Sequence, residues 1–175
     1  MTAVRDPDSG RDQVSERLIG DYQVPLLRLC FMQLHDRALA EDAVQETFLK
    51  AYRGYDRFRG QSGEKTWLCH IAVNVCRDYR RGSWFRHMDR RVTPDMLPEA
   101  SAEPDGQDID LALAIMNLPN KLREAIILYY YHDMGTEEIA EALGIAQSSV
   151  SNRLKRGREK LRRALEGRDQ DAGRA

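Results

Sequence analysis

The stretch that most constrains how this chain can fold is residues 136–163, where the sequence predicts a helix, a tight turn and a second, longer helix. Thr136 is a good N-cap, and the glutamates that follow it suit the positive end of the helix dipole. Gly144 can close this helix because glycine adopts positive φ without strain. The second helix opens near Gln147, and Gly157 on its apolar face allows a close approach. The apolar residues at helical spacing are Val150, Leu154, Leu161 and Leu165.

The opposite face of the second predicted helix is strongly basic. Residues 147–168 contain eight Lys or Arg and only two Glu. Small polar side chains at the start of such a helix can reach base edges in a major groove, and the long cations behind them can reach phosphates. A solvated helix that closes a bundle is the alternative, but the capped helix and glycine turn directly ahead favour DNA binding. The candidate DNA-contacting residues are Gln147, Ser148, Ser149, Ser151, Asn152, Arg153, Lys155, Arg156 and Lys160.

The distribution of charge along the chain supports a nucleic-acid partner, although the formal net charge is only -1. Residues 57–91 contain nine Lys or Arg and three acids, whereas residues 92–110 contain six acids and no Lys or Arg. Two basic blocks are therefore separated by an acidic one, and the near-neutral total hides them.

Composition excludes several classes of protein. A hydrophobic fraction of 42% and a charged fraction of 31% describe a soluble globular protein. No apolar run approaches the ~20 residues that cross a membrane, and the polar N-terminus does not resemble a signal peptide, so we expect a cytoplasmic protein. Cys30, Cys69 and Cys76 lie in helical patterns without a C-x-x-C pair. We therefore expect no disulfide framework, no metal and no cofactor.

Helical periodicity divides the chain into two small all-α domains joined by an extended acidic linker. The first domain spans residues 14–86, and three prolines mark the linker at 87–107. The second domain spans residues 108–168 and ends with the helix-turn-helix. Residues 1–13 and 169–175 are predicted to be disordered.

Three helices are predicted in the first domain, over residues 14–35, 38–53 and 65–81, with a break or kink at Pro25. The second helix presents an acidic and polar face with one exposed leucine, which is either simply solvated or a docking surface for a basic partner. This face consists of Asp42, Gln45, Glu46 and Leu49.

The loop at residues 55–63 combines two glycines, two arginines and two aromatic residues. Flat aromatic rings and guanidinium groups beside a flexible backbone suit stacking on unpaired bases. The same composition also occurs in ordinary connections between helices. The helix after it carries a polar line of side chains at helical spacing. These are His70, Asn74, Arg77 and Arg81.

These motifs resemble a known family when they are taken in order. Residues 42–48 (DAVQETF), 57–60 (RFRG), 66–68 (TWL) and 71–74 (IAVN) are similar to region 2 of bacterial sigma factors. Residues 118–119 (LP), 138–140 (EIA) and 150–154 (VSNRL) are similar to region 4. The chain thus resembles an extracytoplasmic-function (ECF) sigma factor, a class with these two domains and a linker.

The resemblance implies a promoter-specificity subunit without enzymatic activity of its own. The face of Asp42, Gln45, Glu46 and Leu49 would dock on RNA polymerase core, and the basic helix of the second domain would read the −35 element. The resemblance also assigns melting of the −10 element and capture of its bases to the first domain. The residues expected to do this are Arg57, Phe58, Arg59, Gly60, Ser62, Lys65, Trp67, His70, Asn74, Arg77 and Arg81.

The family's usual regulator is an anti-sigma factor, and we expect such a partner here. Apolar surface offered by Ile126, Ile127 and residues 129–131 would let it clamp the second domain. At residues 146–149 (AQSS) the family often has a proline followed by Gly-Thr, and at Cys69 and His70 it more often has aromatic and basic residues. The promoter sequence therefore does not follow from the resemblance.

Two other functions compete with this interpretation. A stand-alone helix-turn-helix regulator would need a dimer interface or ligand pocket in its N-terminal half and would bind duplex DNA alone. An enzyme using Asp42, Glu46 and His70 is a weaker alternative, because no nucleophile or phosphate-binding loop accompanies these residues.

Overall fold

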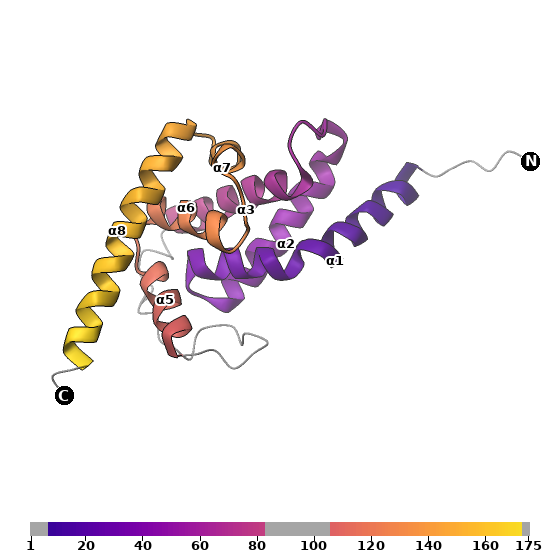
Figure 1. Ribbon diagram of the computed structural model, residues 1–175. Coiled ribbons are helices and arrows are strands. Elements are labelled where there is room, and N and C mark those ends of the chain that lie inside the picture. Colours follow the sequence, from indigo (N-terminus) through magenta and orange to yellow (C-terminus); the bar gives the residue numbers. More distant parts are fainter. Residues whose placement is uncertain (1–6, 83–105, 173–175) are drawn as a thin grey trace, which may run out of the picture.

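The computed structural model describes residues 7–82 and 106–172, with side chains from 10 to 82 and from 109 to 167 (Figure 1). Every regular element within these two ranges is helical, so the predicted all-α class is confirmed. The elements are α1 (Pro7–Leu34), α2 (Arg37–Gly54), the short 3-10 turn η1 (Tyr55–Arg57), α3 (Glu64–Arg81), α5 (Gly106–Met116), α6 (Asn120–Tyr130), α7 (Thr136–Leu143) and α8 (Gln147–Ala172).

The first half of the described chain is a bundle of α1, α2 and α3 (Figure 1). The Asp36 side chain accepts a hydrogen bond of 2.8 Å from the backbone N–H of Leu39 and so caps the start of α2. Small residues on one face of α2 then allow α1 and α3 to approach closely. Those with no more than 1% of their surface exposed are Ala40, Ala43 and Ala51.

Helix α1 is longer than the sequence predicts. It begins at Pro7, so residues 7–13, expected to be disordered, are helical in the structure. Contacts with later elements explain this start, because Arg11 forms an ion pair with Asp56 and the Tyr52 hydroxyl donates to Asp12 over 3.1 Å.

Pro25, at which we expected a break or kink, lies inside one continuous helix. Its ring faces solvent, where the carbonyl that loses its helical partner can bond to water. On the other side of α1, Leu26 and Leu29 are buried in the core and hold the helix to the bundle.

The second half contains the predicted helix-turn-helix, formed by α7 and α8. Gly144 ends α7 with φ +66, the left-handed conformation expected of it. The N-cap of α7 is Gly135 and not Thr136, since the Glu138 carboxylate accepts a hydrogen bond of 2.8 Å from the Gly135 N–H. The Thr136 hydroxyl instead accepts a hydrogen bond of 2.8 Å from the Gln147 amide and ties the starts of the two helices together.

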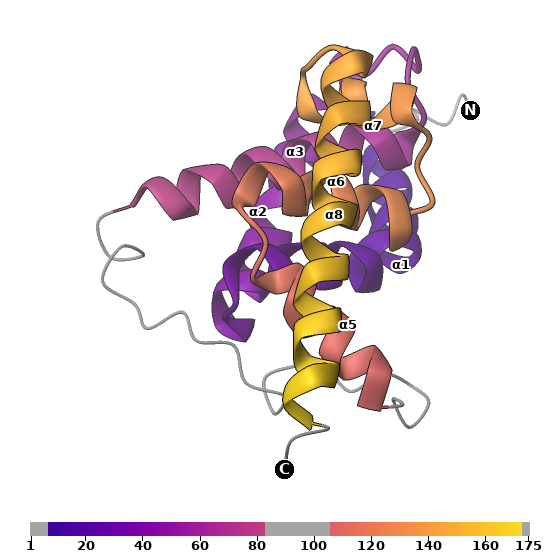
Figure 2. The same cartoon turned by 60° about the vertical axis from the view of Figure 1, so that its left-hand side comes forward.

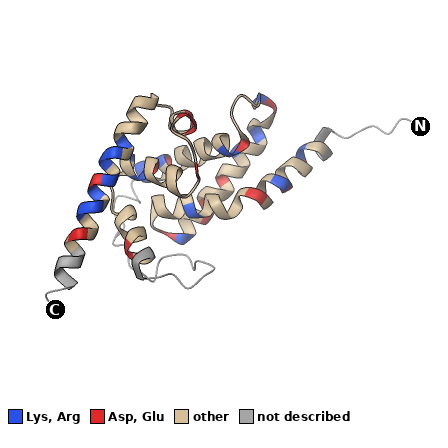
Figure 3. Ribbon diagram, viewed as in Figure 1, with Lys and Arg blue, Asp and Glu red and all other residues tan. Residues whose placement is uncertain are grey.

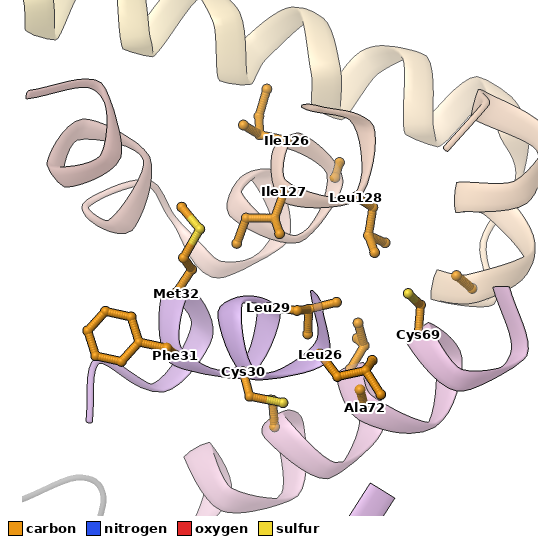
Figure 4. Packing of buried hydrophobic residues seen from close by; sticks show 14 of the residues in the cluster. Leu26, Leu29, Cys30, Phe31, Met32, Cys69, Ala72, Ile126, Ile127 and Leu128 are labelled. Atoms are coloured by element: carbon orange, nitrogen blue, oxygen red, sulfur yellow. The ribbon is translucent and has the colours of Figure 1, made fainter. Parts of the chain in front are cut away.

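The two halves pack directly against each other, which the sequence did not indicate. One continuous cluster of buried apolar side chains runs from α1 to α8. Ile127 points toward Leu29 and Met32 of α1, while Ile126 points toward α8 (Figure 4). Helix α6 thus lies between α1 of the first half and α8 of the second, and α7 lies against α3 (Figure 2).

The close approach of α6 and α8 at Gly157 gives a stability prediction. An added Cβ at Gly157 would lie 2.8 Å from Cγ1 of Ile126, so that side chain would have to move. We expect Gly157→Ala to lower the free energy of unfolding by about 1–2 kcal/mol, because overpacking outweighs the gain in helix propensity. Urea denaturation of the purified protein measures this change.

Gly167→Ala is the matched control, since an added Cβ there meets no atom within 4 Å. This substitution should raise the free energy of unfolding by about 0.5–1 kcal/mol through helix propensity alone. Equal effects at the two glycines would contradict the packing of α6 against α8.

Candidate nucleic-acid and polymerase interfaces

The basic face of α8 is exposed along most of its length (Figure 3). The apolar residues Val150, Leu154 and Leu161 are buried on the opposite side, as their spacing predicts. The candidate DNA-contacting residues on the exposed face are Gln147, Ser148, Ser149, Ser151, Asn152, Lys155, Arg156 and Lys160. A helix with this division can enter a groove while its other face stays in the core.

Arg153 is placed differently from the other candidates on α8. Its side chain is 18% exposed, and its guanidinium lies 3.9 Å from the Glu124 carboxylate. Arg153 therefore faces the interior of this structure, toward α6.

Glu124 of α6 is the centre of a buried ion cluster between the halves, with 2% of its surface exposed. Arg77 of α3 donates to its carboxylate from two nitrogens, over 3.1 and 2.8 Å. Arg80, one turn further along α3, donates over 2.7 Å. Burial by itself would raise the pKa of Glu124, but the hydrogen bonds and charges of Arg77 and Arg80 outweigh it and hold the pKa below its usual value.

Neighbouring polar groups fix the position of this cluster. Arg80 also donates to the side-chain oxygen of Gln33 over 2.6 Å, and Gln33 is itself buried at the end of α1. The backbone carbonyl of Gln33 accepts from Arg123, whose guanidinium also donates to the carbonyls of Met116 and Leu118. The start of α6 is thereby tied to α1 by charge-assisted hydrogen bonds.

Aromatic residues after α2 form a second feature of the first half. The rings of Phe58 and Trp67 are stacked with centroids 4.6 Å apart, and Tyr55 packs against both. Gly60 turns the loop with φ +65. Beside the stacked rings is an open hollow of about 310 Å³. It is lined by Lys50, Gly54, Arg57, Phe58, Trp67, His70, Ile71 and Asn74.

The structure brings five of the predicted −10 residues to this hollow and places the others elsewhere. Arg57, Phe58, Trp67, His70 and Asn74 line it. Arg59 and Arg81 are exposed, and Ser62 is half-buried in the loop before α3.

Three of the predicted −10 residues on α3 also contact the second half of the chain. These are Lys65, His70 and Arg77. Lys65 donates to the backbone carbonyl of His132, and His70 Nδ1 lies 3.0 Å from the carbonyl of Ala142 at the end of α7. The side chain of His70 also contacts Asn74 over 3.1 Å. Helix α7 therefore packs against one face of α3, and α6 reaches that face through the side chain of Glu124.

The predicted docking face on α2 is open. Asp42 and Gln45 are exposed, and Leu49 is 48% exposed. Glu46 forms an ion pair of 2.9 Å with Lys50 on the same helix. Burial raises the pKa of the neighbouring Tyr79, and the charges of Glu46 and Asp42 raise it further.

The apolar surface expected to receive an anti-sigma factor is largely absent. Ile126 and Ile127 are fully buried, because α6 packs between the two halves. Tyr130 is 51% exposed and accepts a hydrogen bond of 2.9 Å from Arg158, and the Arg158 guanidinium also lies over its ring. The prediction of Ile126 and Ile127 as an exposed surface is therefore wrong for this structure.

Periodicity did not reveal Glu124, Arg80 or His132 as interface residues. The sequence did hint at Glu124, since the two adjacent charged residues Arg123 and Glu124 lie inside the apolar run of α6. Such residues are buried only when they are paired, so their position predicts a partner, although not which one.

Comparison with known proteins shows the family. The sequence profile described as sigma-70 region 2 matches residues 18–86, and the profile of sigma-70 region 4 matches residues 109–161. RNA polymerase sigma-H factor of Pseudomonas aeruginosa is 30% identical, covering 90% of this chain and 89% of the relative. ECF RNA polymerase sigma factor SigW of Bacillus subtilis is 32% identical, covering 85% and 87%.

A solved structure supports the same relationship. The sigma factor RpoE of Bartonella quintana, in complex with the anti-sigma factor NepR, is 27% identical and superimposes with a TM-score of 0.68, covering 86% of this chain and 98% of that one. The chain belongs to the sigma-70 family, in its extracytoplasmic-function class. It is an RNA polymerase sigma factor that directs promoter-specific initiation, because its N-terminal half is sigma region 2 and not the sensor of a stand-alone regulator.

Two other kinds of feature are absent from the described residues. None of the helices in 7–82 and 106–172 combines the length and apolar character that spanning a membrane requires. The same part of the chain contains no group of three or more His, Cys, Asp or Glu able to hold a metal ion.

His132, at the interface of the halves, gives a prediction for pH dependence. Only 3% of its surface is exposed, and burial, with the charge of Lys65, lowers its pKa to about 4. The unfolded chain, whose histidine has a pKa of about 6.5, binds this proton more readily, so stability falls as pH drops from about 6.5 toward 4. Between pH 8 and pH 5 this difference in proton binding lowers the free energy of unfolding by about 2 kcal/mol.

Urea denaturation at pH 8 and pH 5 measures this loss, and His132→Asn should remove it. This pH range lies above the ordinary pKa of glutamate, so Glu124 contributes little to the comparison. An equal loss in the wild type and the variant would place His132 in contact with water.

Proposed function

We propose that this sigma factor binds promoter DNA through two separate surfaces and RNA polymerase core through a third. The observation that carries the proposal is the presence in one chain of a hollow beside stacked aromatic rings and an exposed basic helix start. These are the features required for unpaired bases and for a duplex groove, respectively. We place the protein in the cytoplasm, where polymerase and the chromosome are found.

Capture of the −10 element is assigned to the hollow of α3 and the loop before it. The rings of Phe58 and Trp67 offer a flat surface on which a base can stack, and His70 and Asn74 offer polar atoms that can bond to its edge. The neighbouring cations can neutralise the backbone of the separated strand. These are Arg57, Arg59, Lys65, Arg77 and Arg81.

Recognition of the −35 element is assigned to the start of α8. Gln147, Ser149 and Asn152 are exposed near the N-terminus of the helix, where short polar side chains reach bases. Lys155, Arg156 and Lys160 follow on the exposed surface and can contact phosphates or guanine edges.

Docking on polymerase core is assigned to Asp42, Gln45, Glu46 and Leu49 of α2. An exposed leucine among acidic residues suits a partner surface that is basic with an apolar centre. We further propose control by an anti-sigma factor, since the sigma factor of Bartonella quintana was solved with one.

Charge reversal on α2 tests the docking assignment. Asp42→Lys and Glu46→Lys should each abolish stoichiometric capture of purified core polymerase in a pull-down, because like charges then face each other. Glu41→Lys is the control, since Glu41 is exposed on the same helix outside the proposed face. Loss of binding in all three variants, or in none, would remove this face from the interface.

Substitution on α8 tests the −35 assignment. Arg156→Ala should weaken binding of the polymerase holoenzyme to a cognate promoter by roughly 5- to 150-fold, the equivalent of about 1–3 kcal/mol for a base contact. Arg162→Ala is the control, because Arg162 is exposed further along α8 and pairs with Glu166. Equal affinity of Arg156→Ala and wild type for the promoter would exclude Arg156 from recognition.

A further inference from the structure

We propose that Arg17 of α1 is a positioning residue for the proposed capture of −10 bases, and that it acts through the Glu64 carboxylate at the start of α3. Arg17 does not line the base-binding hollow. It binds Glu64, which joins the two ends of the loop between η1 and α3. The inference rests on the proposed function and deepens it, because it adds a residue of α1 to the surface that receives the separated strand.

The first support is the geometry of the contact between Arg17 and Glu64. The guanidinium donates to one carboxylate oxygen from Nη1 over 2.9 Å and to the other from Nη2 over 2.7 Å. This paired arrangement fixes the orientation of both groups as well as their distance, and it is the form in which an ion pair near the surface is most effective. The hydrogen bonds of Arg17 lower the pKa of Glu64 below its usual value, so the carboxylate is charged at neutral pH.

The second support is that the same carboxylate reaches the aromatic rings through Tyr55. The Tyr55 hydroxyl donates to Oε1 of Glu64 over 3.5 Å. The Tyr55 ring centroid lies 6.1 Å from the centroids of both Phe58 and Trp67. Tyr55 belongs to η1, after which the loop begins, and Glu64 is the residue at which α3 begins. Glu64 therefore connects α1 to the ring that packs against the stacked pair.

The third support is that α1 contacts the same region at other points. Arg11 forms an ion pair with Asp56 of η1, and the Tyr52 hydroxyl at the end of α2 donates to Asp12 over 3.1 Å. The Arg11 guanidinium also lies over the Tyr52 ring, 5.6 Å from its centroid. The N-terminal half of α1 thus holds the end of α2 and η1 as well as the start of α3.

These contacts bear on base capture because the loop is flexible by composition. Gly60 and Gly63 lie within it, and glycine loses more conformational freedom on ordering than any other residue. A base that stacks on Phe58 or Trp67 binds more readily when the rings are already in place, since less ordering is then required in the complex. Arg17 contributes to this order from outside the hollow.

Arg17→Gln tests the proposal in the polymerase holoenzyme. The probe is a promoter fragment selected from a random-sequence library by the wild-type holoenzyme, and opening is followed by the permanganate reactivity of its unpaired −10 thymines. The variant should bind core polymerase as wild type does but open this promoter about fivefold more slowly, an effect between those of an isolated surface ion pair and a charge-assisted hydrogen bond. Arg37→Gln is the matched control, since it removes the same charge from an exposed pair with Glu41 on α2. This control should open the promoter at the wild-type rate.

Three readouts separate positioning from a general effect on stability. Glu64→Gln should slow opening as much as Arg17→Gln, and the double variant should be no slower than either, because all three lack one and the same contact. Arg17→Lys keeps the charge but not the paired geometry, so it should recover part of the lost rate. The chain contains two tryptophans, so in a Trp84→Phe background the fluorescence reports Trp67 alone. Arg17→Gln should make this fluorescence easier to quench with acrylamide.

Opening by Arg17→Gln at the wild-type rate, additive losses in the double variant, or unchanged quenching of Trp67 would each overturn the positioning role. Failure of the proposed function has a different signature, which Trp67→Ala supplies. If Trp67→Ala opens the promoter normally, the hollow does not capture bases and the inference falls with that assignment. If Trp67→Ala fails to open it while Arg17→Gln opens it normally, the inference alone is wrong.

Discussion

The structure depends on one buried carboxylate that must be neutralised. Glu124 lies inside the apolar helix α6, and a charge at 2% exposure is tolerated only with partners of opposite sign. Arg77 and Arg80 come from the other half of the chain and supply them. The pairing therefore fixes how the two halves meet, and loss of either member would leave a buried charge at a cost of about 3–5 kcal/mol.

Helix α3 serves two purposes because its faces differ. One side contributes Leu68, Ala72 and Val75 to the core, and the cationic and polar side carries the proposed strand-binding residues. In this structure the second side is partly satisfied by the other half of the chain, through the carbonyls of His132 and Ala142 as well as Glu124. These side chains therefore have partners within the protein, so the cationic surface of α3 does not remain bare.

The features predicted correctly from sequence are those set by local chemistry. Helical periodicity located the helices, and the αL preference of glycine located the end of α7 at Gly144. The apolar stripe of α8 likewise predicted which side faces the core.

The missed features depend on residues far apart in the chain. Arg77 and Glu124 are separated by 47 positions, and the early start of α1 depends on Asp56. No local period encodes such pairs, and the prediction of Ile126 as surface failed for the same reason.

The central claim is that Glu124 fixes how the two halves meet, because it pairs with Arg77 and Arg80 of the other half. The most direct measurement is urea denaturation of Glu124→Gln beside Glu141→Gln, which removes a charge at an exposed position of α7. The account predicts that Glu124→Gln lowers the free energy of unfolding by about 3–5 kcal/mol and that Glu141→Gln leaves it unchanged. Equal free energies of unfolding for Glu124→Gln and wild type would contradict it.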